Sequence, residues 1–185
     1  MNLFSPIPLA IKGVLLALVI AAAVFDIRSR RIPNWLNLLG VLLGLALNLW
    51  LGGFGGLWFA LKGLGLAMLI YFPLYLIRGM GAGDVKLMAA VGAIVGPANW
   101  FGIFVLSNVL GGVAAVLLVM SKGSLSKTLG NLGCMLNELV HFRPPYLRRE
   151  ELDLNSPKAA KMPHGLAIAF GSLAFLAAAW IWGQP

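Results

Sequence analysis

Long apolar segments separated by short polar connections run along most of the chain. Segments of this kind lie at about 8–25, 35–51, 57–77, 85–98, 100–120 and 165–182. A helix needs about 20 apolar residues to cross the hydrocarbon core of a bilayer, with a range of roughly 17–25. The segment at 85–98 is shorter than this, and it crosses only if the glycine-rich stretch 79–83 also lies at membrane depth. The pattern predicts six transmembrane helices.

The overall composition agrees with this interpretation. A soluble domain is usually about 45–50% apolar and about 25% charged. This chain is 60% hydrophobic and only 11% charged, and its mean hydropathy is +0.90. We therefore predict an all-α polytopic membrane protein that forms one transmembrane domain over residues 1–185.

The basic residues predict the orientation of this domain. Twelve of the fourteen lie in the connections after the first, third and fifth segments, whereas the connections at 52–56 and 97–99 carry no charge. Positively charged connections stay in the cytoplasm, so both termini are expected outside. The two exceptions, Lys12 and Lys62, lie near the opposite interface and can extend to it. The net charge of +8 is thus explained by the membrane, with no nucleic-acid partner.

The connection at about 121–163 is the longest one. It carries leucines at spacings of four and three residues, which a helix would place on one face: Leu125, Leu129, Leu132, Leu136 and Leu139. Together with nearby lysines this pattern predicts an amphipathic helix on the cytoplasmic leaflet. A helix that caps the bundle is the alternative.

Two acidic residues stand apart from the other four. Glu138, Glu150, Glu151 and Asp153 lie in the long connection, whereas Asp26 and Asp84 border apolar segments on the predicted cytoplasmic side. A charge beside hydrocarbon costs roughly 3 kcal/mol on insertion scales, which makes it a candidate for function. The glycines before Asp84 allow the backbone to leave helical geometry.

Two carboxyl groups that meet at one level can share a proton. The ionised group can then take a proton from water while the protonated group donates to a carbonyl oxygen. This is aspartyl protease chemistry, which needs neither metal nor cofactor. The single cysteine, Cys134, excludes an intrachain disulfide and a zinc site built from cysteines. The structural alternatives are an ion pair of Asp26 with a following arginine, and pairing of Asp84 with Arg78 or Lys86 or capping of its own helix.

The motifs around these residues resemble a known family. The sequence Gly-Ala-Gly-Asp-Val-Lys-Leu at 81–87 is similar to the Gly-x-Gly-Asp-x-Lys-Leu signature of type IV prepilin peptidases. Asp26 followed by Ile-Pro-Asn at 32–34 resembles their first catalytic motif, and Pro-His-Gly at 163–165 resembles a Pro-x-Gly element near their C-terminus. The resemblance implies that Asp26 and Asp84 are catalytic. It also implies that nearby residues bind substrate or shape the site: Gly81, Gly83, Lys86, Pro33, Asn34, Pro163 and Gly165.

The resemblance further implies an activity. It is that of an intramembrane aspartyl endopeptidase of the bacterial inner membrane that removes the basic leader from prepilins or pseudopilins. In the family the cut follows a glycine at the cytoplasmic border of the substrate's apolar helix. Larger members carry an insert with paired Cys-x-x-Cys zinc sites, associated with N-methylation of the mature pilin. This chain lacks those pairs. It resembles the short, peptidase-only branch serving Flp-type pili, so no methyltransferase activity is expected.

Two other interpretations stay open from the residues alone. The first is a non-enzymatic small transporter or pilus-assembly scaffold subunit, in which the acids are ion ligands or structural pairs. The second is a Gly-x-Gly-Asp protease acting on other membrane anchors. The presenilin-like members of that class have a tyrosine before the first aspartate, where this chain has Phe25, and a Pro-Ala-Leu motif that its last segment lacks.

Overall fold

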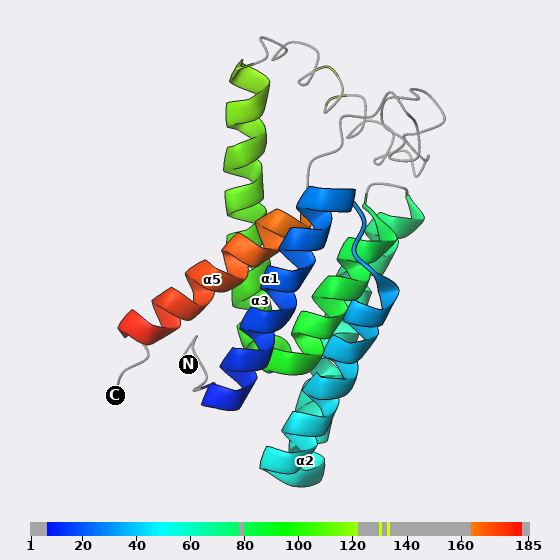
Figure 1. The fold of residues 1–185 in the computed structure, drawn as a ribbon, viewed down its shortest axis with the longest axis vertical. Coiled ribbons are helices and arrows are strands. Elements are labelled where there is room, and N and C mark those ends of the chain that lie inside the picture. Colours follow the sequence, from blue (N-terminus) through cyan, green and yellow to red (C-terminus); the bar gives the residue numbers. More distant parts are fainter. Residues whose placement is uncertain (1–6, 78–79, 122–129, 131–132, 134–163, 183–185) are drawn as a thin grey trace.

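The computed structural model describes residues 7–77, 80–121, 130, 133 and 164–182. In these ranges the long elements are four helices: α1 (Leu9–Ser29), α2 (Asn34–Leu76), α3 (Ala82–Ser121) and α5 (His164–Trp182) (Figure 1). All four are long and apolar enough to cross a membrane. The prediction of an all-α membrane protein is confirmed, but the prediction of six separate helices is wrong.

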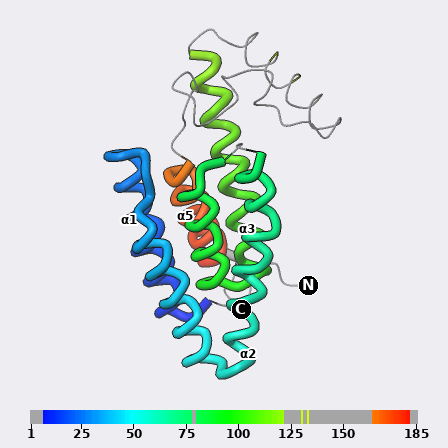
Figure 2. The backbone as a smooth tube through the Cα atoms, turned by 90° about the vertical axis from the view of Figure 1, so that its right-hand side faces the viewer, coloured from blue at the N-terminus to red at the C-terminus, as the bar shows by residue number. Residues whose placement is uncertain are grey.

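The second helix accounts for part of this difference, because α2 contains two of the predicted segments. Its 43 residues change direction at Gly53, whose backbone has φ 57° and ψ −147°. Gly44 and Gly63 both pack against residues 92–93 of α3. A straight helix would hold these two glycines roughly 28 Å apart. The two arms of α2, residues 34–52 and 54–76, therefore run in opposite directions along the first part of α3 (Figure 2).

The third helix reverses in the same way. α3 changes direction at Gly96, with φ 73° and ψ 177°, and Pro97 follows inside the helix. The indole N–H of Trp100 donates to the carbonyl oxygen of Met88 at 3.0 Å, although 12 residues separate them. Only a reversal allows this contact, since 12 residues of straight helix span about 18 Å. The charge-free connections mark the changes of direction, but helical structure continues on both sides of each glycine.

The first arm of α3, residues 82–95, forms the centre of the bundle. Its residues from Leu87 onward are almost all buried, and both arms of α2 cover it. Glycine allows this close packing, because a methyl group at Gly63 would overlap the carbonyl oxygen of Gly92. Asn48 adds polar links between the helices, donating to the carbonyl oxygens of Ala93 at 3.2 Å and Ile94 at 3.0 Å.

The remaining helices, α1 and α5, pack against each other and against α3 (Figure 1). A methyl group at Gly171 of α5 would overlap Ser107 on the second arm of α3. Many large apolar side chains face outward, and Trp50 is 87% exposed and Leu9 84% exposed. Such a surface suits lipid, since soluble proteins rarely expose apolar patches of this extent.

Candidate active site

Asp26 lies near the end of α1 and contacts the start of α5. Its side chain is only 7% exposed, and its Oδ2 accepts a hydrogen bond from the backbone N–H of Leu166 at 3.3 Å. The helix ends just after it, where Arg30 adopts a left-handed conformation and donates its N–H to the Asp26 carbonyl at 2.9 Å. The first N–H groups of a helix have no partners within the helix and attract anions. The N-terminus of α5 therefore holds the Asp26 carboxyl group.

Asp84 lies in the first turn of α3. Its backbone N–H donates to the carbonyl oxygen of Gly81 at 3.1 Å. A side chain at Gly81 would lie 3.2 Å from the Asp84 Oδ2 atom, so glycine leaves the carboxyl group room. The helix begins at Ala82, so Gly81 precedes it, whereas Gly83 at the end of the predicted glycine-rich stretch is already helical.

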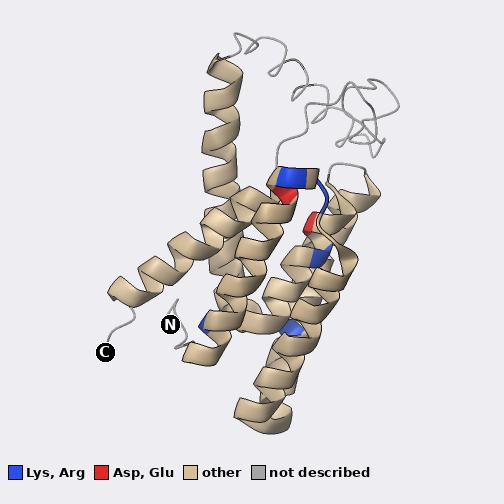
Figure 3. Ribbon diagram, viewed as in Figure 1, with Lys and Arg blue, Asp and Glu red and all other residues tan. Residues whose placement is uncertain are grey.

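Ile32, in the connection between α1 and α2, lies near Gly83, which precedes Asp84, and near Gly165, which lies beside Asp26. A methyl group at Gly83 would lie 3.4 Å from Ile32 Cβ. A methyl group at Gly165 would lie 3.1 Å from Ile32 Cδ1 and 2.9 Å from Asp26 Oδ2. The carboxyl groups of Asp26 and Asp84 are also near enough for their like charges to repel each other. Figure 3 shows the acidic residues of the described part at one end of the bundle, beside basic residues of the α1–α2 connection.

The other predicted site residues surround this end. Pro33 precedes α2 with an extended backbone, and Asn34 begins the helix. The Lys86 ammonium donates to Asn34 Oδ1 at 2.9 Å, which links α3 to α2. Gly165 contacts Asp26 as described above. Pro163 lies outside the described residues, as does nearly all of the connection at 121–163 with its predicted amphipathic helix.

One residue near the site was not predicted from the sequence. Asn37 is 2% exposed, and its Nδ2 donates to the carbonyl oxygen of Gly83 at 3.2 Å. The available signal was an asparagine one helical turn after Asn34, inside an otherwise apolar segment. That signal alone does not reveal which helix the amide faces.

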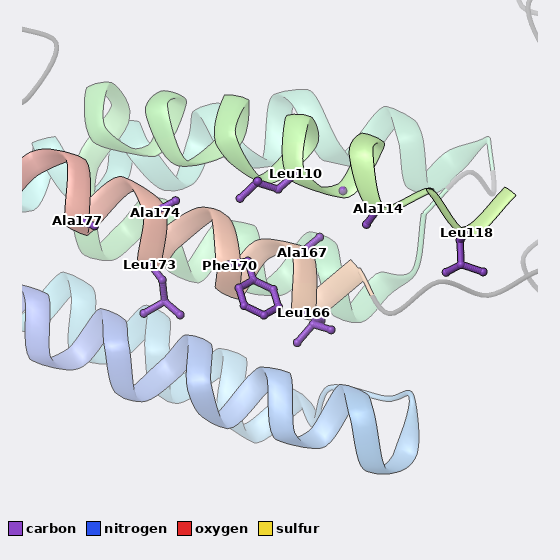
Figure 4. Close-up of a pocket in the computed structure, with 10 residues that line it drawn as sticks. Leu110, Ala114, Leu118, Leu166, Ala167, Phe170, Leu173, Ala174 and Ala177 are labelled. Carbon is purple, nitrogen blue, oxygen red and sulfur yellow. The ribbon is translucent and has the colours of Figure 1, made fainter. Parts of the chain in front are cut away.

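An apolar groove adjoins the site between α5 and the second arm of α3, residues 97–121. Its volume is about 620 Å³ (Figure 4). The lining side chains are apolar and many are small: Leu110, Gly111, Ala114, Leu118, Leu166, Ala167, Phe170, Leu173, Ala174 and Ala177. Leu166 belongs both to the groove and, through its N–H, to the Asp26 environment. The groove therefore begins beside one of the two carboxyl groups.

Fold and site together define a helical membrane protein with two carboxyl groups at one end of its bundle. The chain belongs to the type IV leader peptidase family, whose model matches residues 13–116, more than half of the 185 residues. The matched range includes Asp26 and Asp84, and the family predicted from the motifs is confirmed. Membership implies a membrane-embedded peptidase that acts on a protein substrate. Neither a curated protein nor a solved structure gives a match.

Proposed function

We propose that this protein is an intramembrane aspartyl endopeptidase that removes the basic leader from type IV prepilins or pseudopilins. One observation carries the proposal. Asp26 and Asp84, 58 positions apart and on different helices, come to the same end of the bundle around Ile32. Both lie within the range that matches the leader peptidase family. Two neighbouring carboxyl groups are the minimum that aspartyl protease chemistry requires.

The pair divides the work between a base and an acid. The ionised carboxylate takes a proton from a water molecule, whose oxygen attacks the scissile carbonyl carbon. The protonated carboxyl group donates its proton to the carbonyl oxygen, giving a neutral tetrahedral intermediate. When the carbon–nitrogen bond breaks, the leaving nitrogen takes a proton from the pair. The products are a new carboxyl terminus and a new amino terminus, and the reaction consumes one water.

The charge distribution supports a site on the cytoplasmic side of the bacterial inner membrane. Basic residues of the α1–α2 connection lie at the acidic end of the bundle (Figure 3). The positive-inside rule assigns such an end to the cytoplasm. α1 begins and α5 ends away from it (Figure 1), which agrees with termini on the outer side. A prepilin leader is basic and cytoplasmic, so site and leader would lie on the same side. We propose a peptidase without methyltransferase activity, because the paired cysteines of bifunctional members are missing.

Gly165→Ala tests whether the environment of Asp26 matters for cleavage. The added methyl group would lie 2.9 Å from Asp26 Oδ2 and must displace it. Misplacing a catalytic group by about 1 Å can cost about 100-fold in rate, so we expect a loss of roughly 10-fold to 100-fold. The atoms that the methyl group would meet belong to the side chains of Asp26 and Ile32 and not to the backbone, so thermal stability should change little. Rates of leader removal and melting temperatures in detergent provide the measurement.

Gly13→Ala is the matched control for this substitution. Gly13 also lies in a helix of the bundle, and a methyl group there meets nothing within 4 Å. It should cleave at the wild-type rate. Unchanged cleavage by Gly165→Ala would contradict the placement of Gly165 beside a working carboxylate.

The groove offers a path for the apolar helix of the substrate. Its small residues permit close approach of another helix, and it begins next to Asp26. Ala114→Phe would fill part of the groove and should raise KM by about tenfold, the equivalent of roughly 1.4 kcal/mol. The value of kcat should change little, because the lost contacts bind the substrate equally well in the ground state and in the transition state. Val116→Phe is the control, since Val116 is exposed on the same arm but does not line the groove. Equal KM values for both variants would indicate that lipid, and not substrate, fills the groove.

A further inference from the structure

Asn37 is buried, and only one of the two polar atoms of its side-chain amide has a hydrogen-bond partner among the described residues. The Nδ2 atom donates to the carbonyl oxygen of Gly83 at 3.2 Å. The Oδ1 atom is buried, and among the described residues it has no hydrogen-bond partner. A buried acceptor without a donor is unfavourable. An apolar side chain of the same shape would remove this penalty, at the cost of the hydrogen bond to the Gly83 carbonyl oxygen. Stability alone therefore does not explain an asparagine at this position.

The contact that Asn37 makes lies directly beside Asp84. Gly83 is the residue before the aspartate, and Lys86, two residues after it, donates to Asn34 at 2.9 Å. The first turn of α2 thus holds the chain on both sides of Asp84. The hydrogen bond from Asn37 is partly buried, whereas the one between Lys86 and Asn34 is exposed.

The same part of α2 is also connected to Asp26. Only residues 30–33 separate it from the end of α1. Ile32 in this connection packs near both Gly83 and Gly165, and Gly165 in turn lies against Asp26. The start of α2 is therefore the structural bridge between the two aspartates.

We propose that Asn37 is a positioning residue that sets the separation of Asp84 from Asp26 by tethering the first turn of α3 to the start of α2. This inference rests on the proposed function for its catalytic consequence, but its geometric content is independent of activity. Asn37 touches neither substrate nor the reacting atoms. It acts through the backbone of Gly83.

Asn48 provides a matched control in the same pair of helices. It lies on the same arm of α2, is 6% exposed, and donates to carbonyl oxygens of α3 as Asn37 does. Its contacts are at Ala93 and Ile94, far along α3 from Asp84. Asn37→Leu and Asn48→Leu therefore remove the same kind of bond near the site and away from it.

The test measures the separation of positions 26 and 84 directly. In a Cys134→Ser background, Asp26→Cys and Asp84→Cys are introduced together and treated with a short bismaleimide in native membranes. We expect Asn37→Leu to lower the yield of the cross-link several-fold while the melting temperature stays the same or rises. Asn48→Leu should lower the melting temperature and leave the yield unchanged. If Asn37→Leu does not insert, Asn37→Ala carries the same expectation for the yield of the cross-link.

The corresponding variants with both aspartates intact connect this geometry to chemistry. Asn37→Leu should reduce kcat by roughly tenfold and alter its pH profile, with KM retained, whereas Asn48→Leu should leave kcat and the pH profile unchanged. An unchanged cross-link yield in Asn37→Leu would overturn the positioning role. A wild-type protein that cleaves no prepilin while the yields differ as expected would instead refute the proposed function and leave the positioning role standing.

Discussion

We expect Asp26→Asn and Asp84→Asn each to abolish leader removal while the protein still folds and inserts. Asparagine has the shape of aspartate, so the contact of residue 26 with Leu166 and the packing near Gly81 can persist. It cannot exchange a proton at neutral pH, however, and the pair needs one ionised and one protonated carboxyl group. Positioned acid–base groups contribute about 10²-fold to 10⁴-fold to rate, so we expect a loss of at least about 10²-fold. A prepilin co-expressed with each variant, resolved by size, gives the measurement.

Charge-preserving variants separate a catalytic role from a transporter or scaffold function. If the carboxylates only bind an ion or form structural pairs, Asp26→Glu and Asp84→Glu should be mild and no cleavage product should appear with any substrate. If they are catalytic, the longer side chain displaces the carboxyl group and both glutamate variants should also lose most activity. Full processing by either asparagine variant would refute the catalytic pair.

Gly63→Val should lower the free energy of unfolding more than Gly165→Ala or Asn48→Leu does. A side chain at Gly63 would overlap the carbonyl oxygen of Gly92 and approach the Gly96 Cα atom at 2.8 Å. These are backbone atoms in the centre of the bundle, and they cannot rotate away as side chains can. Overpacking a core usually costs about 1–3 kcal/mol. We expect a loss near the upper end of that range, with loss of activity following from loss of fold.

Gly65→Val controls for the intrinsic effect of valine in this helix. Gly65 lies on the same arm of α2, is exposed, and has open space where a side chain would project. Helix propensities of glycine and valine differ by only a few tenths of a kcal/mol, so its stability should match the wild type. Thermal unfolding in detergent measures both variants. A Gly63→Val protein as stable as Gly65→Val would show that α2 and α3 do not pack through this glycine.

Hydropathy alone predicted the class of fold and the position of the apolar segments. It did not predict that pairs of segments belong to single helices. The predicted connection at 52–56 includes Gly53, and the one at 97–99 begins directly after Gly96. The sequence does not reveal that one residue of positive φ is enough for each reversal, with helical structure resuming at once. Counting charge-free connections as loops therefore gave six helices where the described residues form four long ones.

The two aspartates of the candidate site could be predicted from the sequence, because a charged group is costly beside the hydrocarbon of a membrane. Asp26 and Asp84 were found because carboxylates beside apolar segments require a reason. Whether they lie close together depends on how α2 packs against α3. That packing is determined by contacts such as the one between Gly44 and Ala93, which are almost fifty residues apart in the sequence. The hydrogen bonds of Asn37 to Gly83 and of Lys86 to Asn34 also join α2 to α3, so the sequence alone did not predict them.

The central claim is that two aspartates of this chain hydrolyse a prepilin, and a defined system tests it most directly. The purified protein is reconstituted in lipid vesicles with a synthetic substrate that has a basic leader, a glycine and an apolar helix. Mass spectrometry then identifies every product. We predict cleavage after the glycine by the wild-type protein, and no product from Asp26→Asn or Asp84→Asn. The same leader product from either asparagine variant, at a rate comparable with the wild type, would contradict the claim.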